Sequence, residues 1–351
     1  MMFNHIQTTM TLKRARAIFF LLVCLALSCL TGCSPNRVST TLDEYVERLA
    51  RVMDDKAPNV NFTPTQTFPS KAELRQEVQS LSLNVREFLN LPNCRLSTLV
   101  AERNTALGKT QPPSQRFVYE VTVTQALQEC ADTATDESVQ KQLRELAFAK
   151  QSQLSANYAN LLQTSDELIL AFSQAQGVFA GDSSDGLHAT IAALQYLTAV
   201  NPQQSRLAVQ SEQLEEHLQS LLQHRLPAKL WRTQSHLAES LQTINAWLAP
   251  LFKELNCKST DGAQRAEILR NVFMLFFAEQ IQPLAAQVNT YHYQLSPVLT
   301  ELLKAPNLSP KLLDSVQQRI DAHDIYSAAV REHIELWQDL FSRCAITVTA
   351  Q

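Results

Sequence analysis

The chain has 351 residues, of which 6 are glycine and 14 are proline, and 45% are hydrophobic and 18% charged. At the average glycine content of about 7%, a chain of this length would hold roughly 25 glycines. So few glycines argue against a sheet protein rich in tight turns and against folds with glycine-rich phosphate loops. The formal net charge of −4 argues against a nucleic-acid-binding protein that relies on phosphate contacts.

The N-terminal segment has the features of a secretory signal. Three basic residues precede an apolar run over residues 17–30, which is shorter than the about 20 residues that a membrane-spanning helix needs. The run ends in Leu30-Thr31-Gly32-Cys33, which resembles the lipobox of bacterial lipoproteins. We therefore expect residues 1–32 to be a lipoprotein signal peptide and Cys33 to carry the lipid. The alternatives are an ordinary signal peptide with a coincidental cysteine and an uncleaved membrane anchor.

A lipid on Cys33 would make residues 33–40 a short lipidated tether. Ser34, in place of an aspartate, resembles the pattern for delivery to the outer membrane. Without the signal peptide the chain keeps 27 basic and 34 acidic residues, a formal charge of −7. Because this charge disfavours adhesion to anionic headgroups, the lipid would do the anchoring. These features predict an envelope protein on the inner leaflet of the outer membrane, facing the periplasm.

Four cysteines remain in the rest of the chain, and an even number in an oxidising compartment favours two disulfides. They are Cys94, Cys130, Cys257 and Cys344. The first two lie at the open ends of a predicted helical hairpin with arms at residues 94–108 and 114–130. We therefore expect the first two to pair, and the last two then pair by elimination. A zinc site or thiol catalyst is the alternative, but the chain has no C-x-x-C pair.

Apolar residues at helical spacing predict helices along the whole mature chain. The expected spans are 40–53, 70–91, 94–108, 114–130, 136–179 with a break at 164–167, 187–200, 203–224, 228–248, 262–281, 284–303 and 310–343. Thr40 or Thr41 would be the N-cap of the first helix, with acidic residues in its first turn, and Ser70-Lys71-Ala72-Glu73 is a capping box for the second. Gly108 would follow the end of its helix as the C′ residue, and prolines such as Pro250 and Pro283 would separate the later helices.

No strand pattern of useful length and no repeat of 34 or 40 residues appears in the sequence. We therefore predict an all-α protein, an elongated multi-helix bundle of antiparallel helical hairpins without significant sheet. Three of the five glycines of the mature chain lie between residues 177 and 186, which is the best internal boundary. It would separate an N-terminal helical half, residues 41–176, from a C-terminal half, residues 187–351, unless the two form one continuous domain.

Polar residues gather at the tip of the predicted hairpin, where three cations meet the N-terminus of a helix. This arrangement could bind an anion or a carboxylate. The candidate residues are Arg103, Asn104, Lys109, Ser114 and Arg116. The alternative is a purely structural tip, in which the two arginines pair with acids such as Glu102 and Glu120.

The sequence offers no catalytic constellation and no metal-ligand spacing, so we expect neither a cofactor nor a metal and do not predict an enzyme. There is no H-E-x-x-H motif and no pair of histidines four residues apart. Glu332-His333-Ile334-Glu335 is interpreted as a solvated helix face with Trp337 packed beneath it.

Several of these segments together resemble a family of uncharacterised proteobacterial lipoproteins, domain of unknown function 3080. The likeness rests on the lipobox and on segments listed here: Leu42–Leu49, Cys94, Arg103-Asn104, Gly108-Lys109, Pro113–Arg116, Cys130, Phe276-Phe277 and Ile281–Pro283. It implies no activity and no catalytic residues, but it makes the hairpin tip the first candidate for a functional site.

Two hypotheses follow for the function. The first is a non-enzymatic binding or scaffolding role at the outer membrane, with an envelope protein as partner. The second is a periplasmic binder or enzyme that acts on an anionic small ligand through Arg103, Lys109 and Arg116.

Overall fold

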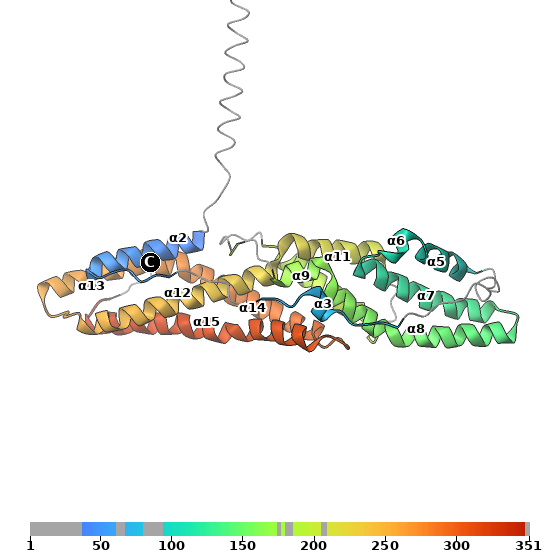
Figure 1. Ribbon diagram of the computed structural model, residues 1–351. Helices are drawn as coiled ribbons and strands as arrows, with labels where there is room; N and C mark the ends of the chain where they lie inside the picture. The colour runs from blue at the N-terminus through green and yellow to red at the C-terminus, as the bar shows by residue number, and fades with distance from the viewer. Residues whose placement is uncertain are drawn as a thin grey trace, which may run out of the picture.

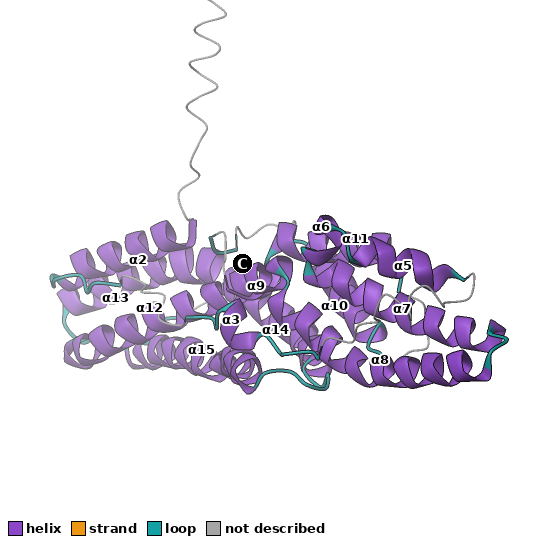
Figure 2. Cartoon of the chain, turned by 45° about the vertical axis from the view of Figure 1, so that its right-hand side comes forward, coloured by secondary structure: helices purple, strands orange, loops and turns teal. Residues whose placement is uncertain are grey.

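We describe the protein from a computed structural model. The described residues are 37–60, 67–79, 94–173, 177–179, 185–204 and 209–347. They form helices, turns and loops, and they contain no strand, so the all-α prediction is confirmed (Figure 2). The predicted signal peptide, residues 1–32, and the predicted lipidation site, Cys33, lie outside the described residues.

The helices form an elongated rod (Figure 1). They are α2 (Arg37–Met53), α3 (Lys71–Leu74), α5 (Arg95–Arg103), α6 (Ala106–Lys109), α7 (Pro113–Thr133), α8 (Glu137–Thr164), α9 (Asp166–Ser173), α10 (Leu187–Ala199), α11 (Ser211–His224), α12 (Leu226–Glu254), α13 (Thr260–Val272), the π-helix η2 (Phe273–Ile281), α14 (Gln282–Leu302) and α15 (Pro310–Arg343).

Each end of the rod is built around one pair of long helices. At one end α12 lies along α15, and α2, α13, η2 and α14 pack beside them. At the other end α7 lies along α8, and α5 packs beside α7. The middle is formed by α9, α10 and α11, which contact helices of both ends.

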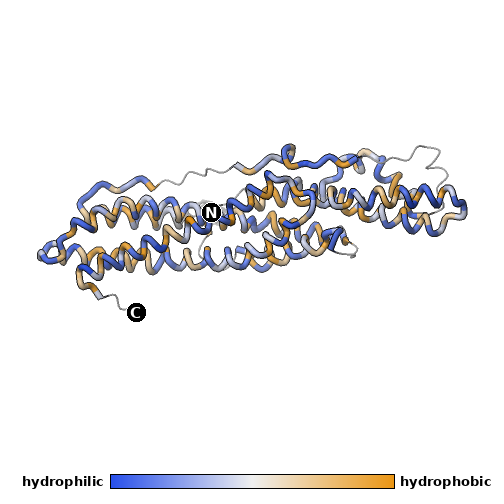
Figure 3. The backbone as a smooth tube through the Cα atoms, turned by 90° about the horizontal axis from the view of Figure 1, so that it is seen from below, coloured by the Kyte–Doolittle hydropathy of each residue, from blue (hydrophilic) through white to orange (hydrophobic). Residues whose placement is uncertain are grey.

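A long apolar core runs through the rod. It includes Phe117 and Tyr158 of α7 and α8 as well as Leu241 and Trp337 of α12 and α15, so it extends to both sides of residues 177–186. A second, smaller cluster lies between α5, α7 and α8. Hydrophobic and hydrophilic stretches alternate along the long helices (Figure 3), as expected when one face of each helix is buried.

The two predicted disulfides are confirmed and lie at opposite ends of the rod. Cys94 and Cys130 are bonded across α5 and α7, with their Cα atoms 5.9 Å apart. Cys257 and Cys344 are bonded just beyond the ends of α12 and α15, with their Cα atoms 5.1 Å apart. Each bond therefore closes a pair of helices at the end of the molecule (Figure 1).

The two N-terminal predictions require corrections. Helix α2 begins at Arg37, so neither Thr40 nor Thr41 is its N-cap and its first turn contains no acidic residue. No glycine or proline interrupts the residues just before position 41, and the helix therefore extends backwards. The capping box of Ser70 and Glu73 is confirmed, but helix α3 ends at Leu74.

The expected helix over residues 70–91 is wrong for the described residues that follow α3. Residues 75–79 are not helical, and residues 80–91 lie outside the described part of the chain. The side chain of Asn160 explains this difference. It accepts a hydrogen bond from the backbone N–H of Gln76 at 2.8 Å and donates one to the backbone carbonyl of Gln76 at 2.9 Å. These bonds compete with those that would continue the helix.

Three later boundaries also differ from the prediction. Helix α11 begins at Ser211, whereas a helix from residue 203 was expected. Pro250 lies inside α12, which ends four residues later, and does not separate two helices. Pro283 lies in the first turn of α14, and the π-helix η2 joins α14 to α13 without a break. The predicted break near residue 165 is confirmed by the end of α8 and the start of α9.

Candidate functional site

The tip of the α5–α7 hairpin is built by local hydrogen bonds. Thr105 caps α6 by accepting a hydrogen bond from the N–H of Gly108 at 3.0 Å, and the guanidinium of Arg103 donates to the carbonyl of Gly108. Gly108 is buried inside α6, where a Cβ atom would collide with the carbonyl of Glu102. The expectation that Gly108 ends a helix as its C′ residue is therefore wrong. Close packing requires the glycine, and α6 places Lys109 at the tip.

A buried carboxylate fixes the next cation of the tip. Glu120 is 1% exposed, and its two oxygens contact Arg116 at 2.5 Å and Lys150 at 2.8 Å. The ring of Tyr119 lies beneath two guanidinium groups, with its centroid 5.9 Å from Cζ of Arg103 and 5.5 Å from Cζ of Arg116. The pairing of Arg116 with Glu120, which the alternative of a structural tip expected, is present.

The opposite side of the site is formed by α3 and the extended residues after it. The two hydrogen bonds between Asn160 and the backbone of Gln76 hold this segment against α8. Lys71 forms an ion pair with Asp166 at the start of α9. A segment from residues 71–78 therefore lies beside the hairpin tip.

These elements enclose an open groove of about 980 Å³, which we call the cationic groove. This is the upper part of the usual range of about 300–1,000 Å³ for ligand sites. Its charged lining residues are Lys71, Arg75, Glu77, Arg103, Lys109 and Arg116. Among the described residues, five cations and one carboxylate therefore line the groove. Two of the cations come from α3 and the segment after it, two from α5 and α6, and one from α7.

The lining of the groove carries more positive than negative charge, although Arg116 is paired with Glu120 and Lys71 with Asp166. Burial lowers the pKa of Arg103, and the charge of the neighbouring Arg116 lowers it further. The lining also contains two buried polar atoms that have no hydrogen-bond partner in the described structure, Nη1 of Arg116 and Oε1 of Gln111. A bound anion would stabilise the charged form of the arginines and would supply an acceptor to Nη1.

The structure brings three of the five predicted site residues together. Arg103, Lys109 and Arg116 line the cationic groove, whereas Asn104 and Ser114 do not. The backbone N–H of Asn104 bonds to carbonyls of α5. The hydroxyl of Ser114 donates to the carboxylate of Glu215 on α11 at 2.7 Å, and Ser114 is buried.

The sequence analysis missed the cations on the opposite side, Lys71 and Arg75. Their spacing of four residues was visible beside the capping box, and it would place them on one helix face. Nothing in the sequence, however, brings this helix next to a hairpin tip more than 20 residues further on. That placement depends on Asn160 of α8.

The polar lining of the cationic groove is made of basic and amide side chains together with Glu77 and Thr164. Its described residues include no histidine, cysteine or serine that could act as a nucleophile with an adjacent base. The described part of the chain holds no cluster of three or more histidine, cysteine, aspartate or glutamate residues with metal-binding geometry. No helix within the same part is both long and apolar enough to cross a bilayer.

The fold and the groove define an elongated, disulfide-bonded, all-α protein with a cationic groove at the junction of α3, α6, α7 and α8. Residues 42–348 match the family described as protein of unknown function (DUF3080), and the chain belongs to this family. Comparison with curated proteins gave no significant match, and comparison with solved structures gave none either.

Proposed function

We propose that the protein is a non-enzymatic binding protein of the bacterial envelope and that it holds an anionic ligand in the cationic groove. One observation carries this proposal: Lys71, Arg75, Arg103, Lys109 and Arg116 line one groove together with a single acid, Glu77. Guanidinium and ammonium groups bind phosphate and carboxylate through charge-assisted hydrogen bonds. The ligand therefore carries one or more phosphate or carboxylate groups.

The envelope location is part of the same proposal. The lipobox at Cys33 supports lipid attachment, and Ser34 supports delivery to the outer membrane of a proteobacterium, with the rod facing the periplasm. Two disulfides are typical of proteins in an oxidising compartment and support export. Because α2 begins four residues after Cys33, the rod would lie within about 15 Å of the lipid.

The groove is tested most cleanly at its two exposed cations. Arg75 and Lys109 are exposed, and neither side chain has an ion pair or hydrogen bond within the described residues. The double variant Arg75→Ala/Lys109→Ala should therefore fold normally. We expect its affinity for citrate and pyrophosphate to fall about tenfold or more, as measured by calorimetry at constant ionic strength.

The matched control is Lys141→Ala/Arg331→Ala, which removes the same charge from exposed positions on α8 and α15. It should bind both probes as the wild type does. The proposal is wrong if the wild type shows no saturable binding of either anion. It is also wrong if the control loses as much affinity as the groove variant, because the effect would then come from net charge alone.

A further inference from the structure

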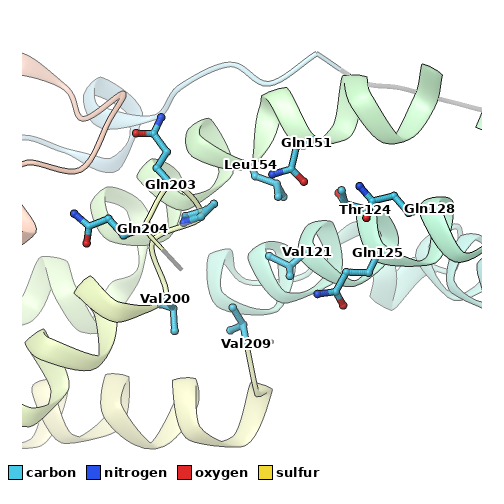
Figure 4. Close-up of a pocket in the computed structure, with 11 residues that line it drawn as sticks. Val121, Thr124, Gln125, Gln128, Gln151, Leu154, Val200, Gln203, Gln204 and Val209 are labelled. Carbon is cyan, nitrogen blue, oxygen red and sulfur yellow. The ribbon is translucent and has the colours of Figure 1, made fainter. Parts of the chain in front are cut away.

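Two histidines from different helices meet outside the cationic groove. A smaller groove of about 440 Å³ lies between α7, α8 and the loop that follows α10 (Figure 4), but its described polar side chains are glutamines and a threonine, which do not change charge with pH. The seam between α14 and α15 is different. His292 of α14 and His323 of α15 stack face to face there, with ring centroids 3.6 Å apart and planes inclined by 12°.

Hydrogen bonds fix the neutral form of His323, which is 4% exposed. Its Nε2 lies 3.0 Å from the carbonyl oxygen of Asn289 on α14. That oxygen can only accept, so Nε2 carries the proton. Nδ1 is then bare, and the hydroxyl of Ser327 donates to it at 3.3 Å. The neutral ring therefore bonds α15 to α14, and a second proton on Nδ1 would displace the bond from Ser327.

The rest of the seam brings the two rings into contact. His292 is half-buried, and its Nδ1 lies 3.3 Å from the hydroxyl of Ser296. The ring of Tyr293 stands edge-on to both imidazoles, with centroid distances of 5.4 Å and 5.5 Å. Close by, the hydroxyl of Tyr326 donates to the carbonyl of Ala285 on α14 at 2.8 Å. Uncharged groups thus hold the two helices together here.

One carboxylate acts on the pair. The charge of Asp324 on α15 favours the protonated form of both imidazoles. Arg319, one turn before His323, donates from Nη1 to the carbonyl of Ser315, which lies a further turn away from the pair. The other charged or titratable groups on this part of α15 and on the helices packed against the seam have no hydrogen bond, ion pair or ring contact with either histidine among the described residues; they are Asp321 of α15, His188 of α10, Lys229, Arg232, His236 and Glu239 of α12, and Glu279 of η2.

This environment disfavours the charged form of both rings. Burial, and then the neighbouring His323, lower the pKa of His292 to about 4, and burial also lowers the pKa of His323. An imidazole in water has a pKa of about 6.5. The separated rings therefore bind protons more strongly than the stacked rings, and separation becomes more favourable as pH falls from about 6.5 towards 4.

We propose that His292 and His323 form an acid-sensitive latch between α14 and α15. While both rings are neutral, the stack and the hydrogen bond to Asn289 keep this part of the seam closed. When both rings take up protons, their charges repel each other and the seam opens locally. The latch uses no residue of the cationic groove, and the proposal depends neither on the anionic ligand nor on the lipid anchor.

The test measures amide hydrogen exchange of residues 33–351 at pH 7 and pH 4.5, corrected for the intrinsic exchange rates. We expect peptides from residues 288–296 and 319–327 to exchange about tenfold faster or more at the lower pH. His292→Gln should lose most of this increase, because glutamine can bond to Ser296 but takes up no proton. The matched control is His188→Gln, at an exposed position of α10, which should behave as the wild type does.

Two further measurements separate the latch from acid unfolding of the whole protein. Peptides from α7 and α8, at the other end of the rod, should show no comparable increase. In NMR titrations of the imidazoles, Asp324→Asn should move the midpoints of His292 and His323 to lower pH, whereas Asp314→Asn, another exposed position of α15, should not. The proposal is overturned if the seam peptides show no acid-induced increase, if α7 and α8 show the same increase, if His292→Gln keeps it, or if Asp324→Asn leaves both midpoints unchanged.

Discussion

The buried imidazole of His333 shows how a single polar residue can be fixed by its surroundings. The indole N–H of Trp337, which can only donate, lies 3.0 Å from Nε2, and the hydroxyl of Tyr45 lies 2.9 Å from the same nitrogen. Nε2 is therefore the bare nitrogen, and Nδ1 carries the proton. Nδ1 donates to Oδ1 of Asn245 at 2.6 Å, while the amide nitrogen of Asn245 donates to the carbonyl of Ala329 at 3.1 Å.

This network joins α2, α12 and α15, and it leads to a prediction about stability. His333→Leu would leave the polar groups of Tyr45, Asn245 and Trp337 buried without their partner. Because each unsatisfied buried group costs about 1–3 kcal/mol, we expect the free energy of unfolding to fall by roughly 3 kcal/mol or more in urea denaturation. His188→Leu, at an exposed position, should change it by less than about 0.5 kcal/mol. Equal effects of the two substitutions would contradict the role of the network.

The same residue makes stability depend on pH. Burial lowers the pKa of His333 to about 3, so the folded protein keeps this imidazole neutral at pH values where the unfolded chain binds a proton. Stability is therefore lost as pH falls from about 6.5 towards 3, at up to about 1.4 kcal/mol per pH unit for this one group. His333→Leu removes that contribution, so the difference between wild type and variant should shrink with falling pH. If the difference in the free energy of unfolding between wild type and variant is the same at pH 7 and pH 4, His333 is not the source of the pH dependence.

The burial of His333 was not predicted, and the interpretation of this residue as part of a solvated face is wrong: it is 0% exposed. The signal was in the sequence. His333 belongs to a stripe of buried residues at helical spacing, Tyr326, Ala329, His333, Trp337 and Leu340. The glutamates on either side, Glu332 and Glu335, made this part of the helix look solvent-exposed. A histidine in the sequence does not show whether the core provides a hydrogen-bonding partner for it.

At the scale of the elements, periodicity and covalent links were predicted best. The last helix was expected over residues 310–343 and is found there as α15. The hairpin of α5 and α7 was placed well enough to pair Cys94 with Cys130. The prediction was wrong where the conformation of a segment depends on residues far away in the sequence. The helix expected from Ser70 onwards ends at Leu74, and Asn160 binds the backbone that follows.

The extended segment after α3 provides a direct test of that explanation. Asn160→Ala removes both hydrogen bonds to the backbone of Gln76. Because the segment after α3 then loses its two hydrogen bonds to α8, we expect faster tryptic cleavage, most of all after Arg75. Limited proteolysis followed by mass spectrometry would measure the cleavage rates.

Gln76→Ala is the matched control for this experiment. The bonds involve only the backbone atoms of Gln76, so the alanine variant keeps them. Its cleavage rate should equal that of the wild type. If Asn160→Ala and Gln76→Ala are cleaved equally fast, the amide of Asn160 does not hold the segment, and another contact must be responsible for ending α3.

At the scale of the whole molecule, the cationic groove could be predicted only in part. Arg103, Lys109 and Arg116 are close in sequence, so local reasoning placed them together. Lys71 and Arg75 complete the groove through tertiary contacts that no local pattern encodes.

The orientation of the rod links the proposed anchor to the site. The start of α2 and helix α6 lie along the same edge of the rod in two views (Figures 1 and 2). A lipid on Cys33, four residues before α2, would hold that edge towards the membrane. The hairpin tip that carries Lys109 would then face the bilayer surface, where anionic headgroups and their fragments are found.

The anchor itself is tested by Cys33→Ser. Residues 33–351 have a formal charge of −7, and any local attraction of the cationic groove to anionic headgroups is screened in high salt, whereas a lipid would supply about 0.8 kcal/mol for each buried methylene. We therefore expect the wild type to stay with the membrane fraction in high salt and to incorporate a clickable palmitate analogue, and the variant to do neither. The variant should still bind citrate as the wild type does, because Cys33 lies outside the groove. A Cys33→Ser protein that remains in the membrane fraction would indicate that an uncleaved apolar segment is the anchor. The short tether between Cys33 and α2 would then no longer determine which edge of the rod faces the membrane.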